Sequence, residues 1–354
     1  MLRSEEGGAL QFNDTWVLTL SNDGGTASWR RLETHGEPPS PRTGCVWREV
    51  FDTGQPLKPY LLRRHALACV DGQQVLLIGG CSASTGFLAD AYSLDVGSWT
   101  WTAIAHSTLA PSPRDKLSAT VLGDRVMIFG GFGPQEPGAA EAHSDSSSGD
   151  KGGGGEESEE GSDSGDAAAF TWFNDVHTLK RTGGAWAWSA TEVLGEPPSA
   201  RAAHAAAAVG SRMFVFGGRD TSGRINDTFA LDAVPLSWSR IAADAPAPAA
   251  RSFHVLASLQ PSPGAVCFGG LSTDGTMLDS LEVLDARAVP VWAQPEGRTG
   301  TWPPPCAIAA SAMLGSRLVV ISAASSDGQP CSCTMLDCAA VRACLDAPVV
   351  AAAV

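Results

Sequence analysis

Short apolar runs that end in a Gly-Gly pair recur along the chain. The clearest are VLLIGG ending at Gly80, VMIFGG at Gly131, MFVFGG at Gly218 and AVCFGG at Gly270. Residues 213–251 show the whole unit: after Gly-Gly come Asn-Asp, an alternating segment, a Trp and then Pro-x-x-Arg. Apolar runs followed by alternating ones, with turn residues between them, are typical of antiparallel strands. Each unit is therefore predicted to form one small sheet of four short strands.

The spacing of the units predicts how the sheets are arranged. The second glycines lie 51 residues apart (80 to 131) and 52 apart (218 to 270). The gap from 131 to 218 is one unit plus about 36 residues, and weaker copies lie at Gly7-Gly8 and at Ser322-Ala323. A period of about 50 residues is that of kelch repeats, whose sheets cannot hide both faces alone and stack around a channel. The predicted fold is an all-β, six-bladed kelch β-propeller.

Tryptophans recur once in each unit, near its fourth strand. Their large side chains are suited to filling the space between neighbouring blades, so they are assigned to the core. The five that occupy this place are Trp29, Trp101, Trp188, Trp238 and Trp292.

The domain boundaries follow from the same units. Residues 1–345 are predicted to form the propeller and 346–354 a tail. The first unit has its third and fourth strands only, which predicts an incomplete first blade and a start that lies upstream of Met1. Residues 45–62 interrupt the pattern as a loop. Residues 134–168 carry a net charge of −9 out of −14 for the chain and have almost no apolar content, so they are predicted to be a disordered acidic Gly/Ser-rich insertion.

Composition narrows the classes of function. The chain has no run of 18 apolar residues, no basic footprint for nucleic acid, and an N-terminus without the apolar region of a signal peptide. Its nine cysteines are an odd number, which favours a reduced intracellular protein over a disulfide framework. We therefore expect a cytoplasmic or nuclear protein, or both, that binds neither membranes nor nucleic acid.

No catalytic or metal constellation is apparent, and no cofactor is expected. Four clustered cysteines do not have a standard zinc spacing and favour an outer strand instead: Cys331, Cys333, Cys338 and Cys344. The histidines at 65, 204 and 254 recur at the start of first strands, so they are assigned to packing. Copper radical oxidases also use kelch propellers but need ligand tyrosines, and this chain has only Tyr60 and Tyr92. Enzymes, of the oxidase or specifier-type lyase class, are the third choice.

Strand direction predicts a binding surface. In a four-stranded meander, the loops from strand two to three and from strand four to the next blade emerge on the same face. Cations, aromatics and a hydroxyl converge there: Lys116, Phe132, Trp172, Arg219, Arg224, Ser252 and Phe253. The planar donor fork of Arg suits a carboxylate, with an extended peptide behind it. The alternative is that the two rim arginines, Arg219 and Arg224, pair with Asp220 and Asp227 on a solvated loop.

Several motifs resemble those of kelch domain-containing substrate receptors of cullin–RING ubiquitin ligases. They are PSPRDKLSATVLGDRVMIFGGFG, FTWFNDVHTL, EPPSARAAHAAAAVGSRMFVFGGRDTSGRINDT and ARSFHVLAS, and the likeness runs from about residue 7 to 323. In that family the propeller captures the C-terminal glycine end of other proteins, a C-degron. The family's pocket positions match the seven residues named above. The resemblance implies a non-catalytic receptor that binds C-terminal tails of client proteins for ubiquitylation.

The sequence also departs from the family pattern. Phe132 stands where the family has a tyrosine, Phe253 where it has a tryptophan, and Ala307 lies nearest to a further tryptophan of the family. The family's helical box, which docks elongin B/C and a cullin scaffold, is matched only poorly by MLDCAAVRACLDAP. The alternative function is therefore a kelch scaffold for protein–protein interaction with no link to ubiquitin.

Overall fold

The computed structural model describes ten stretches of the chain. They are residues 14–20, 27–40, 65–82, 84–135, 169–242, 247–287, 289–295, 303–314, 316–322 and 333–346. The predicted loop insertion at 45–62 lies outside them. So does the acidic insertion from residue 136 to 168, whereas Pro134 and Gln135 are described and Pro134 ends a strand.

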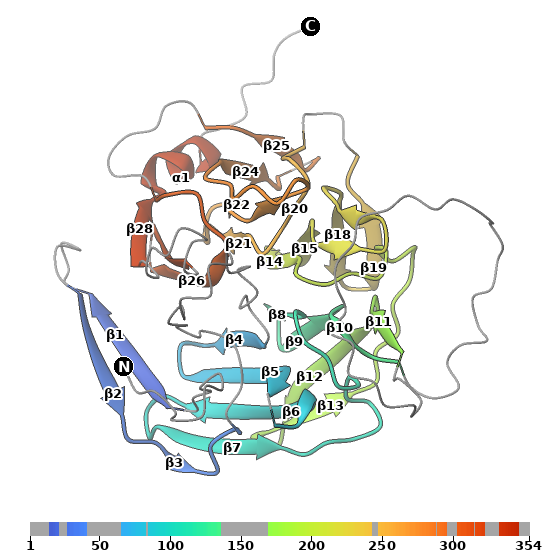
Figure 1. The fold of residues 1–354 in the computed structure, drawn as a ribbon, viewed down its shortest axis with the longest axis vertical. Helices are drawn as coiled ribbons and strands as arrows, with labels where there is room; N and C mark the ends of the chain where they lie inside the picture. Colours follow the sequence, from blue (N-terminus) through green and yellow to red (C-terminus); the bar gives the residue numbers. More distant parts are fainter. Residues whose placement is uncertain are drawn as a thin grey trace, which may run out of the picture.

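Five antiparallel blades are arranged around a common centre (Figure 1). The first consists of β4 (Ala66–Val70), β5 (Gln74–Ser82), β6 (Gly86–Asp95) and β7 (Thr100–Ile104), with β3 (His35–Gly36) parallel to β7 at its edge. The second consists of β8 (Ser118–Leu122), β9 (Arg125–Phe129), β12 (Val176–Thr182) and β13 (Ala185–Ser189). The third consists of β14 (Ala205–Val209), β15 (Arg212–Phe216), β18 (Thr228–Ala233) and β19 (Leu236–Arg240).

The last two blades follow in chain order. The fourth consists of β21 (Val255–Ser258), β22 (Gly264–Phe268), β24 (Leu281–Asp285) and β25 (Val291–Ala293). The fifth has three strands, β26 (Ile308–Leu314), β27 (Arg317–Ser322) and β28 (Cys333–Asp337). The first strand of each blade contacts the first strand of the next, from β4 through β8, β14 and β21 to β26. The all-β propeller expected from the repeat is therefore present, with five blades.

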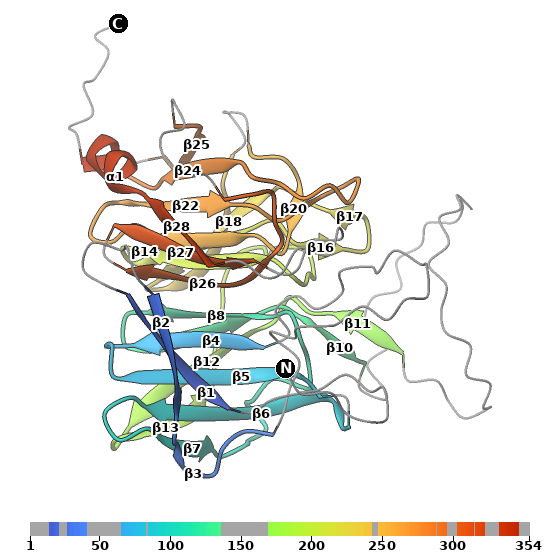
Figure 2. The same cartoon turned by 60° about the vertical axis from the view of Figure 1, so that its left-hand side comes forward.

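The predicted six blades are present only in part. The outer half of the expected first blade is a two-stranded sheet of β1 (Thr15–Leu20) and β2 (Ala27–Leu32). It lies on the side of the ring between the β4–β7 blade and the β26–β28 blade (Figures 1 and 2). Among the described residues no inner strands accompany it. The structure thus has five blades and one half-blade.

The Gly-Gly pairs close each blade against the next. In the second blade, Gly130 and Gly131 have φ of 67° and 111°, which side chains with a Cβ rarely adopt. A Cβ on Gly130 would lie 2.8 Å from the carbonyl oxygen of Arg201 in the following blade. Gly131 N donates to that same oxygen at 2.8 Å. Glycine is therefore required both by the backbone conformation and by the close approach of the next blade.

Three of the five recurring tryptophans fill interfaces between blades, as predicted. Trp188 packs with residues of the β4–β7 blade, Trp238 with residues of the β8–β13 blade, and Trp292 with residues of the β14–β19 blade. Trp101 is buried as well, against Leu77 and Leu94 of its own blade. The side chain of Trp29, in β2, is outside the described part of the chain.

The segment with the clustered cysteines forms the predicted outer strand in part, because β28, which contains Cys333, is the outermost strand of its three-stranded blade. Cys333–Asp337 is β28, the third strand of its blade, and the helix α1 (Ala339–Asp346) follows in place of a fourth strand. Val341 and Leu345 of α1 pack into the core between the fourth and fifth blades, beside Val255 and Leu336. Six described cysteines are free thiols. No described helix is long and apolar enough to cross a membrane.

Candidate functional site

The residues predicted to form a binding surface do lie on one face of the propeller. In the second and third blades, the residue after Gly-Gly pairs with the residue that follows the Pro-x-x-Arg arginine: Phe132 with Asp115, and Arg219 with Ala202. In the fourth blade, β20 (Arg251–Ser252) and β23 (Leu271–Ser272) form the same pair. Figure 2 shows β10 (Phe132–Pro134), β11 (Phe170–Trp172), β16 (Arg219–Asp220), β17 (Gly223–Arg224) and β20 on one side of the disc. We call this side the loop face.

Three successive blades are joined at the loop face by backbone hydrogen bonds. Ala203 N donates to Lys116 O, and Phe253 N donates to Ala203 O, both at 2.9 Å. These three residues occupy equivalent places and all have positive φ, of 54° to 55°. Positive φ is uncommon for residues other than glycine, asparagine and aspartate, and such backbone strain gathers at functional sites. The arrangement fixes Lys116 and Phe253 at matching positions around one centre.

Beneath the loop face lies a layer of buried arginines, one in each of three blades. Arg201 donates to both carboxylate oxygens of Asp227, at 2.6 and 3.0 Å, and to Gly217 O at 3.1 Å. Arg114 binds both oxygens of Asp175 and donates to Gly130 O, and Arg251 donates to Glu282 and to Gly269 O. These arginines tie the loop before each first strand to the Gly-Gly turn of the same blade.

One acidic partner of this layer, Asp175, keeps its charge at low pH. Burial raises the pKa of Asp175, but hydrogen bonds from His177 and Arg114 lower it further, so that the net pKa lies well below its ordinary value. His177 Nε2 lies 2.9 Å from Asp175 Oδ2. The Asn-Asp motif in the sequence was the available signal for Asp175 and Asp227, and their pairing with the buried arginines was not predicted.

The two rim arginines face each other across a short hairpin. Arg219 and Arg224 are cross-strand partners in β16 and β17. Arg224 Nε donates to Ser252 Oγ at 2.9 Å, and Ser252 is 1% exposed. Arg219 is exposed, and the described residues offer its guanidinium no ion-pair partner. The structure thus brings together three of the predicted residues, Arg219, Arg224 and Ser252, from two blades.

The acids considered as alternative partners are engaged elsewhere. Asp227 accepts the fork of the buried Arg201. Asp220 accepts from the hydroxyls of Ser199 and Ser222 at 2.8 and 2.6 Å. Burial raises the pKa of Asp220, and the hydrogen bonds from Ser222 and Ser199 outweigh it and lower the pKa. Both carboxylates are therefore held by groups other than the two rim arginines.

The predicted aromatic residues form the neighbouring part of the loop face. Phe132 and Trp172 are cross-strand partners in β10 and β11, with ring centroids 5.1 Å apart. Lys116 Nζ lies 5.3 Å from the centre of the Phe132 ring and 3.3 Å from Asp115 Oδ1. The cation therefore stands between a buried carboxylate and an aromatic face.

Phe253 belongs to a small apolar cluster on the other side of the rim arginines. It packs with Met277 against the buried Leu271 and Ala307. Ala307 lies near the position of a further tryptophan in the resembled family. It is fully buried here and forms part of the packed core below the loop face. All seven predicted residues are thus on the loop face, in three groups: aromatic with Lys116, cationic with Ser252, and apolar around Phe253.

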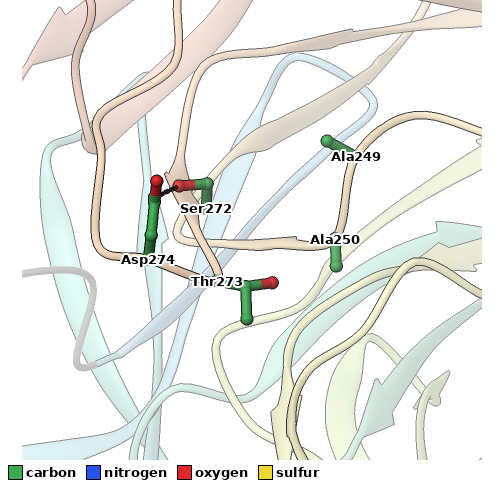
Figure 3. Close-up of a pocket in the computed structure, with 5 residues that line it drawn as sticks. All are labelled: Ala249, Ala250, Ser272, Thr273 and Asp274. Carbon is green, nitrogen blue, oxygen red and sulfur yellow. Dashed lines mark hydrogen bonds between the residues drawn. The ribbon is translucent and has the colours of Figure 1, made fainter.

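The loop face also has a shallow pocket of about 380 Å³. It is lined by Ala249, Ala250, Ser272, Thr273 and Asp274, and none of the seven predicted residues lines it. In Figure 3 the Ser272 hydroxyl points to the Asp274 carboxylate, to which it is hydrogen-bonded. That bond, with the Thr276 backbone amide, lowers the pKa of Asp274 to about 2. The pocket is thus next to the predicted surface and separate from it.

Two of the three recurring histidines, His204 and His254, pack as expected. His204 Nε2 lies 2.8 Å from Ser118 Oγ of the preceding blade, and its ring contacts Phe129. Burial, with the positive charge of Arg201, lowers its pKa to about 3. His254 packs against Phe216 in the same way. Among the described residues, no three His, Cys, Asp or Glu side chains gather as metal ligands would.

Comparison with known proteins identifies the repeat family. The model of the KLHDC2/KLHL20/DRC7 Kelch-repeats domain matches residues 46–146 and 154–323, more than half of the chain. The chain belongs to this kelch-repeat family. The matched range includes all seven predicted site residues and every blade from β4 to β27.

Individual kelch proteins are similar over much of the same range. Kelch domain-containing protein 2 of Bos taurus is 30% identical over 268 residues, which is 74% of this chain and 55% of that protein. Kelch domain-containing protein 1 of Mus musculus is 34% identical over 226 residues, 60% of this chain and 49% of that protein. Acyl-CoA-binding domain-containing protein 4 of Arabidopsis thaliana is 25% identical over 218 residues, 61% of this chain and 24% of that protein. The chain spans about half the length of the two kelch domain-containing relatives.

Proposed function

We propose that this kelch propeller is a non-catalytic substrate receptor that binds the C-terminal tails of client proteins for cullin–RING ubiquitylation. The observation that carries the proposal is the pair of rim arginines on β16 and β17, next to Ser252. The exposed guanidinium of Arg219 and the Ser252-bound guanidinium of Arg224 lie on opposite strands of one hairpin. Two forks in this arrangement suit a terminal carboxylate, which accepts two parallel hydrogen bonds from each fork.

The surroundings of the arginines support a peptide rather than a small anion. Phe253 with Met277 provides an apolar neighbour on one side, and Phe132 with Trp172 provides one on the other. A carboxylate at the arginines would therefore have room for uncharged residues along the loop face. The phenylalanines at 132 and 253 lack the phenol and indole donors that the resembled family has there. The side chains at these two positions therefore cannot select a peptide through hydrogen bonds. The terminal carboxylate becomes the main polar group that the site recognises.

Peptide binding tests the carboxylate site. A peptide that ends in Gly-Gly with a free carboxylate should bind, and the same peptide with an amidated end should not. Arg219→Ala should weaken binding by about 2–5 kcal/mol, because it removes charged donors from a partly desolvated contact. Arg219→Lys should also weaken it, since a point charge cannot make the bidentate fork. Calorimetry on the full chain measures each of these.

A matched control separates this effect from a general loss of positive charge. Arg181 is exposed near the end of β12 in the neighbouring blade, beside the turn from the third to the fourth strand on the opposite face. Arg181→Ala should bind the peptide as tightly as the wild type does. Equal affinity for the free and amidated peptides, or an Arg219→Ala variant that binds normally, would show that the carboxylate site is wrongly assigned.

One observation favours the second candidate, a kelch interaction scaffold with no link to ubiquitin. Helix α1 is where the resembled family has its adaptor-binding box, and the apolar residues Val341 and Leu345 of this helix are buried in the propeller core. A helix that docks an adaptor needs an apolar face turned outward. Purification of the tagged chain from cells, scored by mass spectrometry for elongin and cullin subunits, separates the two functions. Their absence, together with carboxylate-dependent peptide binding, would favour the scaffold.

A further inference from the structure

Four half-buried or exposed aromatic rings form a contiguous cluster on the loop face, across two blades. They belong to Phe87 of β6 and to Phe132, Phe170 and Trp172 of β10 and β11, and we call them the aromatic shelf. Ring centroids lie 5.6 Å apart for Phe87 and Phe170, and 5.8 Å apart for Phe132 and Phe170, whose rings are stacked. Phe132 lies 6.1 Å from Phe87 and 5.1 Å from Trp172. The outermost member, Phe170, is 53% exposed.

The aromatic shelf differs from the other exposed apolar residues because its rings lie next to one another. Val234 and Val289 are more exposed still, but each lies alone in the turn between a third and a fourth strand. Single exposed apolar residues are common on folded proteins and need no explanation, whereas a contiguous group of aromatic rings marks a contact surface. Aromatic side chains also lose little entropy when a partner orders them.

The shelf is connected to the rim arginines through the backbone. Asp115 and Phe132 exchange hydrogen bonds at 2.8 and 2.9 Å, Ala203 N donates to Lys116 O, and Ala202 exchanges hydrogen bonds with Arg219. The shelf and the arginine hairpin are thus held on adjacent blades by successive main-chain contacts. Figure 2 shows β10, β11, β16 and β17 on the same side of the disc. Lys116 lies at the end of the shelf that faces the arginines, over the Phe132 ring.

We propose that the aromatic shelf is a second specificity site, which binds an apolar side chain of the client tail a few residues before its carboxylate. This inference rests on the proposed function, because the carboxylate at the rim arginines sets the position of the tail. Phe170 and Phe87 then select the client, together with Phe132 and Trp172. The occupant is a large apolar residue, aromatic or aliphatic. An acidic residue there would lie beside aromatic faces, which repel anions.

The geometry gives the approximate position of that residue. Packed sheets lie about 10 Å apart, and an extended peptide advances about 3.3 Å per residue, so a step of one blade takes roughly three residues. The carboxylate is bound between the third and fourth blades, and the shelf spans the first and second. We therefore expect the apolar residue roughly three to six positions before the C-terminal residue.

A peptide scan tests the shelf. The probes are ten-residue peptides that end in Gly-Gly with a free carboxylate and otherwise contain Ser, with one Phe moved through successive positions. The full-length chain should bind the peptide with a well-placed Phe about tenfold more tightly than the all-Ser peptide, since burying a large apolar side chain gives on the order of that gain. In the Phe170→Ala variant this preference should fall below about threefold, while affinity for the all-Ser peptide stays unchanged. Phe170→Leu should restore part of the preference.

Matched variants keep the two proposals apart. Val289→Ala truncates an exposed apolar residue on the opposite face and should leave both affinities unchanged. Arg219→Ala should weaken the Phe and all-Ser peptides by the same factor. If binding depends on the free carboxylate but shows no preference for Phe at any position, the shelf proposal is wrong and the carboxylate site stands. If neither peptide shows carboxylate dependence, both proposals are wrong. A wild-type dimer that Phe170→Ala dissociates in light scattering would assign the shelf to a second copy of the chain and overturn the proposal.

Discussion

The β14–β19 blade has two arginines near its loop face in contrasting surroundings. Arg201 has a fully buried side chain that donates to Ser199, Gly217 and Asp227. Arg219 is exposed, and its hydrogen bonds within the described part of the chain are those of its main chain, which pairs with Ala202 and with β17. Burying a guanidinium group costs free energy unless all its donors form hydrogen bonds. We therefore assign Arg201 a structural role. The donors of Arg219 face solvent, where a ligand can reach them. Two arginines of one blade can thus be assigned to different roles by counting their internal partners.

Removing the buried member of the pair should produce the largest effect. Arg201→Ala leaves the Asp227 carboxylate without its fork, and breaking a buried ion pair in this way costs about 3–5 kcal/mol. Urea denaturation of both variants measures the difference. Arg219→Ala should remain within about 0.5 kcal/mol of the wild-type free energy of unfolding, as surface substitutions usually do. The comparison fails if both substitutions destabilise the chain equally.

The buried layer should also make stability depend on pH, through His204. Its folded-state pKa of about 3 is below the unfolded value of about 6.5, because burial disfavours the charged ring. The stabilisation is fully present above about pH 6.5 and is lost as the pH falls toward 3, at up to about 1.4 kcal/mol per pH unit. Denaturation at pH 7.5, 6.5 and 5.5 measures this slope.

Two controls isolate the contribution of His204. Unfolded-state carboxylates titrate near pH 4, so the lowered pKa of Asp175 affects stability only in more acid solution. His204→Gln should therefore flatten the slope between pH 6.5 and 5.5, while a Gln at the exposed His106 should leave it unchanged. A wild-type slope that persists in His204→Gln would assign the effect to other groups.

The repeat made most of the fold predictable. Gly-Gly pairs, a recurring Trp and a spacing of about 50 residues reflect local strand and turn chemistry that each blade repeats, so the blades and their packed tryptophans could be read from the sequence. The loop face was expected from strand direction, and Arg219, Arg224 and Ser252 do lie next to one another on it. Six blades were predicted and five with a half-blade were found, because the decayed first unit has no described inner strands.

The features that were missed depend on contacts between distant parts of the chain. Arg114 and Asp175 are separated by the acidic insertion, so no local pattern joins them. Phe87 belongs to the first blade, and its place in the aromatic shelf arises only when β6 meets β10 and β11 of the next. Helix α1 replaces an outer strand because Val341 and Leu345 find a packed core beside Leu336, which the preceding Leu-Asp motif did not reveal.

The smallest expected effect concerns the acidic insertion. Deleting it would sharpen the contrast between the exposed Arg219 and the buried Arg201. The acidic residues 136–166 follow β10 and precede β11 in the chain, and both of these strands lie on the loop face, as the exposed Arg219 does, whereas Arg201 is buried. Deleting 136–166 should strengthen binding of acidic tails by a few fold and change basic or neutral tails less. It should not alter the free energy of unfolding. The effect should fade as salt is raised, since the Debye length falls from about 10 Å at 0.1 M to about 3 Å at 1 M. Peptide titrations at low and high salt, before and after deletion, decide the matter: equal affinities in all four conditions would make the insertion an inert spacer.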